Sequence, residues 1–260
     1  MKPMSFLLCL LLVASAAEPD PFARSTQLIV VTTSDWSAVE GRLVRYERAT
    51  PREPWRPLGE PIPIVVGKNG LGWGIGVIAA DDPKVRAGSD PVKKEGDGKA
   101  PAGVFALGTA FGYAPQPLRG LKMPYLNLTP SVECVDDVGS KYYNHVVDRS
   151  AVAPDWNSSE HMRSVDLYQW GLVVDHNGMV TDVDARPPAP GAGSCIFLHI
   201  WRGPGQGTVG CTAMPQVELE TLLTWLDPMR KPLLVQLPAP EYGRLMHHWK
   251  LPALAAEKGP

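Results

Sequence analysis

Short apolar stretches, several of them alternating with polar residues, recur along most of the chain. Gln27–Thr33 is rich in β-branched residues, and Gly41–Glu47 alternates apolar with polar positions, as a half-buried strand does. The same criteria predict further strands at Ile62–Val66, Val104–Leu107, Trp170–Asp175, Cys195–Trp201 and Leu233–Leu237. The pattern therefore predicts a mainly β fold.

One segment near the end of this series changes to a helical pattern. Pro215 opens it, Glu218 and Glu220 lie near its start, and Pro228 ends it. Proline in the first turn and acidic residues near the positive end of the helix dipole both favour a helix. Its apolar positions are Val217, Leu219, Leu222, Leu223 and Leu226. We predict one clear helix here.

Proline and glycine mark the connections between these elements. The chain holds 27 Pro and 25 Gly, which favour short strands and many turns over long helices. We expect turns at 55–59 and 100–103, a loop at 186–193 and a surface tail at 238–260. Residues 109–165 have weak periodicity and are expected to form an enlarged loop region over the sheet. The glycine-rich stretch 67–74 lacks the Lys-Ser/Thr ending of a phosphate-binding loop, so we predict no nucleotide site there.

The first residues are typical of a secretory signal peptide. Lys2 gives a positive start, residues 6–13 are apolar, and Ala14-Ser15-Ala16-Ala17 supplies small residues for cleavage. The apolar run is too short to anchor the chain stably in a bilayer. We therefore predict that residues 1–17, with Cys9, are removed, and that the protein is exported, with the periplasm as the expected compartment.

Length and charge narrow the classes of partner. A chain of 260 residues can bury a substantial core, and its formal net charge of -2 comes without any basic block. Nucleic acid is therefore not expected as a partner. We predict a monomer without a membrane anchor after cleavage of the signal peptide.

Three cysteines remain after removal of the signal peptide: Cys134, Cys195 and Cys211. An odd number in an oxidising compartment leaves one without a disulfide partner. A Cys134–Cys195 disulfide with Cys211 free is the arrangement we expect. Spacing does not fix the connectivity, and the alternative is that all three are small buried apolar residues.

His199 and Cys211 are the strongest candidates for chemistry. His199 lies at the end of an apolar strand, and Cys211 follows a glycine-rich loop and precedes the predicted helix. A helix N-terminus and a neighbouring imidazole both favour the thiolate, which attacks carbonyl carbons to form an acyl-enzyme. Backbone N–H groups around Gly210, Cys211 and Thr212 would bind the oxyanion. Taken singly, a strand histidine and a lone cysteine are more often structural residues.

Two stretches in the same order resemble the L,D-transpeptidase catalytic domain family, whose fold is called YkuD-like. They are Lys94-Glu95-Gly96-Asp97-Gly98-Lys99-Ala100-Pro101-Ala102-Gly103-Val104-Phe105, and Cys195-Ile196-Phe197-Leu198-His199 with Thr208-Val209-Gly210-Cys211-Thr212-Ala213-Met214. The resemblance covers roughly residues 25–237. It implies a β-sandwich catalytic domain that cuts and rejoins peptidoglycan stem peptides. It also implies Cys211 as nucleophile, His199 as base, and Ile200 as the residue whose carbonyl orients the histidine.

The chain departs from the common form of that family at two positions. Val209 stands where the family has histidine, and Ala213 where it has arginine or asparagine shortly after the cysteine. This variant is more similar to an offshoot that hydrolyses links between wall and protein. Arg202 is a candidate for the missing positive charge, because a guanidinium suits a carboxylate; the alternative is a solvated loop arginine.

Three further residues are candidates for substrate binding: His176, Tyr168 and Trp170. His176 ends a strand expected beside the His199 strand, with the alternative that it caps a turn. Tyr168 and Trp170 would form an aromatic wall, although strand aromatics are more often core. His145 and His161, with Glu133, Asp136, Asp137 and Glu160, lack zinc-ligand spacing, so we predict neither a metal nor a cofactor.

Three functions remain open at this point. The first is acyl transfer between wall peptides, and the second is hydrolysis by the same site, as a carboxypeptidase, endopeptidase or amidase. They differ in whether an amine or water attacks the acyl-enzyme. The third is a non-catalytic wall-binding module of the same fold, which a blocked or unreactive Cys211 would favour.

Overall fold

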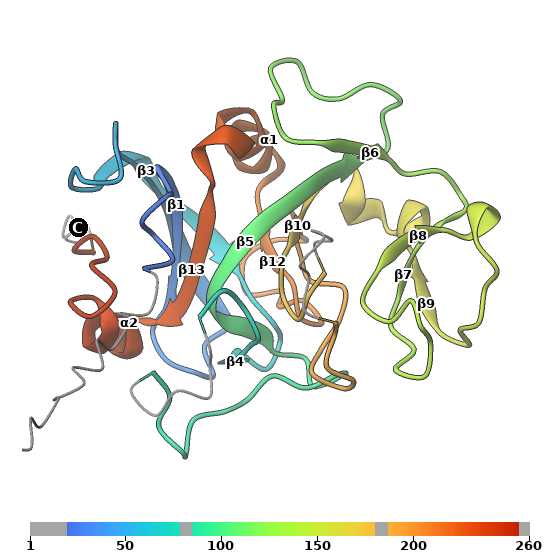
Figure 1. Ribbon diagram of the computed structural model, residues 1–260, viewed down its shortest axis with the longest axis horizontal. Helices are drawn as coiled ribbons and strands as arrows, with labels where there is room; N and C mark the ends of the chain where they lie inside the picture. The colour runs from blue at the N-terminus through green and yellow to red at the C-terminus, as the bar shows by residue number, and fades with distance from the viewer. Residues whose placement is uncertain (1–19, 79–84, 180–186, 255–260) are drawn as a thin grey trace, which may run out of the picture.

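The computed structural model describes residues 20–78, 85–179 and 187–254 (Figure 1). The predicted signal peptide at 1–17 and Cys9 lie outside these residues. Within them, no helix is long and apolar enough to cross a membrane.

Thirteen strands and two α-helices form the described part of the chain. The strands are β1 (Gln27–Thr33), β2 (Glu40–Glu47), β3 (Arg56–Val65), β4 (Leu71–Trp73), β5 (Ala100–Gly112), β6 (Tyr125–Asn127), β7 (Val132–Val135), β8 (Val146–Asp148), β9 (Ser159–His161), β10 (Trp170–Val174), β11 (Phe197–Ile200), β12 (Thr212–Met214) and β13 (Leu233–Pro238). The helices are α1 (Gln216–Trp225) and α2 (Ala239–Leu245). Four 3₁₀ turns are η1 (Arg149–Ala151), η2 (Met162–Ser164), η3 (Asp166–Tyr168) and η4 (Pro228–Arg230). The predicted mainly β class is confirmed.

Ten strands form one sheet that closes on itself. The hydrogen-bonded order is β10-β11-β12-β3-β2-β1-β13-β5-β4, with β6 on β5, and β10 also pairs with β5. The sheet is therefore barrel-like, which differs from the expected sandwich of two sheets. The long strand β5 makes closure possible, because its thirteen residues are enough to pair with β13 near one end and β10 near the other (Figure 1).

Two of the predicted turns lie inside strands. Residues 56–59 begin β3, and residues 100–103 begin β5. Prolines had favoured the turn reading, but β3 tolerates them at Pro57, Pro61 and Pro63. Among the described strands, Pro57 and Pro63 pair only with β2, Pro61 falls at the irregularity in that pairing, and β12 reaches β3 only at Val65. Proline is accommodated on such an open strand edge because no ladder partner needs its missing N–H.

Residues 109–165, expected as an enlarged loop region, contain a second sheet. Strands β7, β8 and β9 form it in the order β8-β7-β9, and all its pairings are antiparallel. Figure 1 shows this sheet beside the barrel, on the side of β10. The small sheet carries Glu160 on β9, and the 3₁₀ turns that follow carry Tyr168 toward β11.

The predicted single helix is α1, which lies against β10 and β11 through the buried Leu219, Leu222 and Leu223. The second helix, α2, occupies what was expected to be a surface tail. Tyr242 is fully buried in it and its hydroxyl donates to the carbonyl of Pro252 at 2.7 Å. The tail is part of the core because its apolar side chains cover β13 and β1.

Leu245→Ala is expected to lower the free energy of unfolding by about 3 kcal/mol, because it leaves a cavity where a fully buried leucine packs. Urea denaturation followed by tryptophan fluorescence measures the change. The neighbouring exposed His247→Ala is the control, with an expected change within about 0.5 kcal/mol. Equal effects for both variants would contradict the assignment of the tail to the core.

Candidate active site

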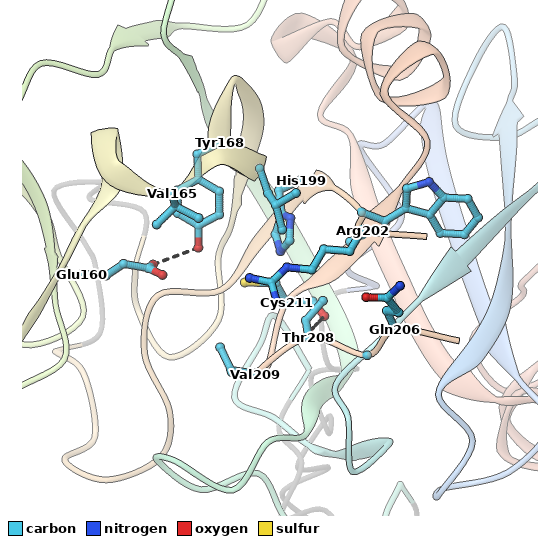
Figure 2. Close-up of a pocket in the computed structure, with 13 residues that line it drawn as sticks. Glu160, Val165, Tyr168, His199, Arg202, Gln206, Thr208, Val209 and Cys211 are labelled. Carbon is cyan, nitrogen blue, oxygen red and sulfur yellow. Dashed lines mark hydrogen bonds between the residues drawn. The ribbon is translucent and has the colours of Figure 1, made fainter. Parts of the chain in front are cut away.

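Cys211 and His199 line the same pocket, a cavity of about 290 Å³ (Figure 2). His199 is on β11, and Cys211 immediately precedes β12, which runs parallel to β11. The register pairs Leu198 with Thr212, which places Cys211 beside the backbone of Phe197. The N–H of Phe197 donates to the Cys211 sulfur at 3.3 Å. The sheet therefore positions the thiol and the imidazole together, although they are twelve positions apart in the sequence.

One hydrogen bond fixes the tautomer of His199. Its Nδ1 lies 2.7 Å from the carbonyl oxygen of Ile200, the contact that the family resemblance implied. Because a carbonyl oxygen only accepts, Nδ1 carries the hydrogen and Nε2 is left with a lone pair. Burial lowers the pKa of His199 to about 4, and Arg202 adds to this by its charge. The ring is therefore neutral at pH 7 and can accept a proton at Nε2.

Cys211 is a buried, free thiol. Burial raises its pKa to about 12, and the negative charge of Glu160 acts in the same direction. The expected thiol at a helix N-terminus is wrong, because β12 lies between Cys211 and the start of α1 at Gln216. A helix dipole acts mainly within its first turn, so α1 gives the thiolate little support. The resting pair is therefore a neutral thiol with a neutral imidazole.

This resting state predicts how alkylation of Cys211 depends on pH. Below its pKa of about 12, a thiol reacts through its small thiolate fraction, so the alkylation rate is expected to rise about tenfold per pH unit between pH 7 and 10. Iodoacetamide labelling followed by peptide mass spectrometry measures the rate. A plateau reached below pH 9 would show instead that a stable thiolate is present at rest.

A threonine that the sequence reasoning missed holds the loop before Cys211. The Thr208 hydroxyl donates to the Cys211 carbonyl at 2.6 Å and accepts from the Gly210 N–H at 3.1 Å. Its backbone joins the end of β3, since the Thr208 N–H donates to Val66 and the Thr208 carbonyl accepts from Lys68. A Ser or Thr that begins a tight turn often bonds in this way, and that pattern was the available signal.

The two stretches that carried the family resemblance meet behind the thiol. An added side chain at Gly210 would lie 3.3 Å from the carbonyl oxygen of Lys99, so the glycine permits a close approach of the two backbones. Lys93, just before the upstream stretch, is buried and its ammonium donates to Asp97 at 2.8 Å and to the Lys94 carbonyl. The Lys93 charge favours the thiolate of Cys211, against the larger effect of burial.

The predicted oxyanion residues are held in different ways. The N–H of Gly210 already donates to Thr208, and Thr212 is buried with its hydroxyl donating to Gln236 at 2.7 Å. In this state Gly210 would have to release Thr208 before binding an oxyanion. Thr212 contributes to the β11–β12 ladder opposite Leu198.

Glu160 and Tyr168 lie on the side of Cys211 away from Thr208 and Gln206 (Figure 2). The Tyr168 hydroxyl donates to the Glu160 carboxylate at 2.8 Å, and both residues line the pocket (Figure 2). The rings of Tyr168 and His199 meet in an edge-to-face arrangement, with their centroids 5.3 Å apart. Burial raises the pKa of Glu160. Tyr168 was a predicted substrate contact, whereas Glu160 had been considered only as a metal ligand.

The remaining predicted substrate residues divide into two groups. Arg202 lines the pocket, whereas His176 and Trp170 are absent from its lining among the described residues. β10 does lie beside β11, but the antiparallel register puts Gly171 opposite His199. His176 therefore lies toward the far end of the pair, fully buried between the Ile75 N–H and the Ala192 carbonyl. Trp170 packs against Tyr125 instead.

Cys134 and Cys195 form a disulfide, which leaves Cys211 free, as the count of cysteines had led us to expect. It joins β7 of the small sheet to a residue two positions before the start of β11. The Cys195 carbonyl accepts from the Cys211 thiol at 3.5 Å, and Asn144 accepts from the Cys195 N–H at 2.9 Å. The disulfide thus ties the small sheet to backbone that contacts the thiol.

Comparisons with protein-family models, curated proteins and solved structures found no match to the chain. In the described parts of the chain, no group of three or more His, Cys, Asp or Glu side chains is arranged to hold a metal ion.

Proposed function

We propose that the protein is an exported cysteine acyltransferase of the L,D-transpeptidase type, with a YkuD-like fold, acting on peptidoglycan stem peptides. One observation carries the proposal: Cys211 shares a pocket with His199, whose Nδ1 is fixed by Ile200 so that Nε2 is the free base. The Cys134–Cys195 disulfide supports export, because such bonds persist in oxidising compartments.

The proposed reaction follows from the neutral resting pair. His199 Nε2 takes the thiol proton as the Cys211 sulfur attacks the carbonyl carbon of a peptide bond. When the tetrahedral intermediate collapses, the carbon–nitrogen bond breaks and the imidazolium gives the proton to the leaving amine. The thioester is then cleaved by an acceptor amine, which gives transfer, or by water, which gives hydrolysis.

A carbapenem tests the nucleophile separately from the acceptor. Attack of the Cys211 sulfur on the β-lactam carbonyl opens the ring without losing an atom, so the protein mass is expected to rise by the full mass of the drug. Peptide mapping should place the adduct on Cys211, and Cys211→Ala should give none. An unchanged protein mass after prolonged incubation, together with a Cys211 that resists alkylation, would instead favour the wall-binding module.

Isolated peptidoglycan then separates transfer from hydrolysis. With an acyl-acceptor peptide present, a transferase is expected to give new crosslinked stem peptides, whereas a hydrolase gives only shortened or released ones. Mass spectrometry of the digested wall distinguishes these products. Crosslinked products made equally by Cys211→Ala would contradict the proposed enzyme.

A further inference from the structure

Two glutamates of the small sheet have opposite environments. Glu133 on β7 is buried and accepts from Arg149 at 3.2 Å, Trp156 at 2.9 Å and Ser159 at 2.7 Å, with the ring of His161 3.2 Å away. Glu160 on β9 has one hydrogen-bond partner among the described residues, the Tyr168 hydroxyl. Glu133 is therefore a satisfied structural carboxylate, and Glu160 is not.

The strand register explains why the two carboxylates face different surroundings. Glu133 pairs with His161, and the next residue, Cys134, pairs with Glu160. Paired residues in an antiparallel ladder project to the same face, and successive residues project to opposite faces. Glu160 thus shares its face with the disulfide that leads to Cys195, and this is the face toward the pocket.

The charges around the pocket leave Glu160 without a cation. Arg149 pairs with Glu133, which the ring of His161 also contacts, and Lys93 pairs with Asp97 behind the thiol. Arg202 lines the same pocket, but no ion pair joins it to Glu160 among the described residues. A half-buried carboxylate held by a single hydroxyl is costly unless a positive group comes to it.

We propose that Glu160 binds a protonated primary amine of the acyl donor in the pocket that it shares with Cys211. The free enzyme then keeps a protonated, slowly reacting thiol, because burial and Glu160 both disfavour the thiolate. Binding of a cationic substrate cancels the effect of the Glu160 charge. The inference deepens the proposed function and depends on it only for the identity of the donor.

Thiol reagents of different charge test this recognition without any wall substrate. Each methanethiosulfonate reacts by one displacement: the Cys211 thiol loses its proton to solvent, its sulfur bonds to the reagent's sulfenyl sulfur, the reagent's S–S bond breaks, and methanesulfinate leaves with the electron pair. The probes are 2-aminoethyl methanethiosulfonate, which carries an ammonium, and neutral methyl methanethiosulfonate. Each rate is divided by that of the same reagent with 2-mercaptoethanol, which removes intrinsic reactivity.

The cationic reagent is expected to react with Cys211 about tenfold faster than the neutral one after this correction, since the carboxylate and the thiol share a partly desolvated pocket. Glu160→Gln should bring the ratio close to one and make the neutral reagent faster than in the wild type. Asp136→Asn is the matched control: Asp136 raises the pKa of Glu160 but does not line the pocket, so the ratio should remain high.

An unchanged ratio in Glu160→Gln would overturn the proposal, and so would an equal fall in Asp136→Asn, which would indicate only a general field. If Glu160→Gln does not fold, Tyr168→Phe is the variant to compare. It keeps the Glu160 carboxylate, so the preference for the cationic reagent should persist. Loss of that preference would overturn the assignment. These labelling rates require no acyl transfer. A protein that reacts as expected here but ignores carbapenem would contradict the proposed function alone.

Discussion

His199→Gln is expected to slow acylation of Cys211 by a carbapenem by about 10²- to 10⁴-fold. The reason lies in the resting state of the pair. The thiol is protonated at pH 7 and the attack requires a base, which the neutral Nε2 of His199 supplies. Glutamine retains an N–H donor for the Ile200 carbonyl but has no basic nitrogen. Stopped-flow or quenched mass spectrometry measures the rate.

The pH dependence of the same rate checks the assignment of the base. A group with a pKa of about 4 loses its free lone pair only as the pH falls through that value. The wild-type rate should therefore show no loss attributable to His199 between pH 7 and 5, and a fall near pH 4. His199→Gln should lack that fall. The exposed residue His247, changed to Gln, serves as the control. If His199→Gln is acylated at a rate within threefold of that of His247→Gln, His199 is not the base.

Replacing both Cys134 and Cys195 with alanine is expected to lower the free energy of unfolding by about 4 kcal/mol. The disulfide spans a sequence separation of 61 residues, and closing a loop of this size restricts the unfolded chain by about that amount. Urea denaturation at a fixed pH gives the difference. The double variant is preferred to single ones, which would leave a second reactive thiol near Cys211.

Reductant provides the internal control for this experiment. Dithiothreitol should destabilise the wild type by a similar amount and leave the double variant unchanged. A decrease in the free energy of unfolding of less than about 1 kcal/mol would mean that non-covalent contacts, rather than the disulfide, mainly hold the small sheet in place. In that case, carbapenem acylation by the double variant should also stay near the wild-type rate, because the Cys195 carbonyl would keep its place beside the thiol.

The parts of the fold that were predicted well have strong local patterns. Gln27–Thr33 is β1 with the predicted limits, and α1 lies within the predicted helical segment. The pairing of His199 with Cys211 was suggested by sequence order and nearby glycines, and the pocket brings these two residues together. Each of these signals lies within a few residues of the feature it predicts.

The parts that were missed depend on long-range contacts or on conflicting local signals. Strands β7, β8 and β9 have three or four residues each, too few to show a period, so Glu160 gave no sign of lying near Cys211. Helix α2 contains Pro240 and Gly243, which normally argue against a helix, although proline is acceptable in the first turn. The spacing of Tyr242, Leu245 and Trp249 was a helical signal that was not used.

The pairing of β13 between β1 and β5 has a consequence for the order in which the protein matures. Synthesis completes β13 after all of the other described strands, yet β13 joins β1 to β5 in the middle of the chain. Until it is made, Cys134, Cys195 and Cys211 are present in a chain whose barrel is incomplete, and any two of them can be joined. The native pair is then chosen by the finished sheet rather than by the order of synthesis, so an early disulfide that includes Cys211 would have to undergo disulfide exchange to free it.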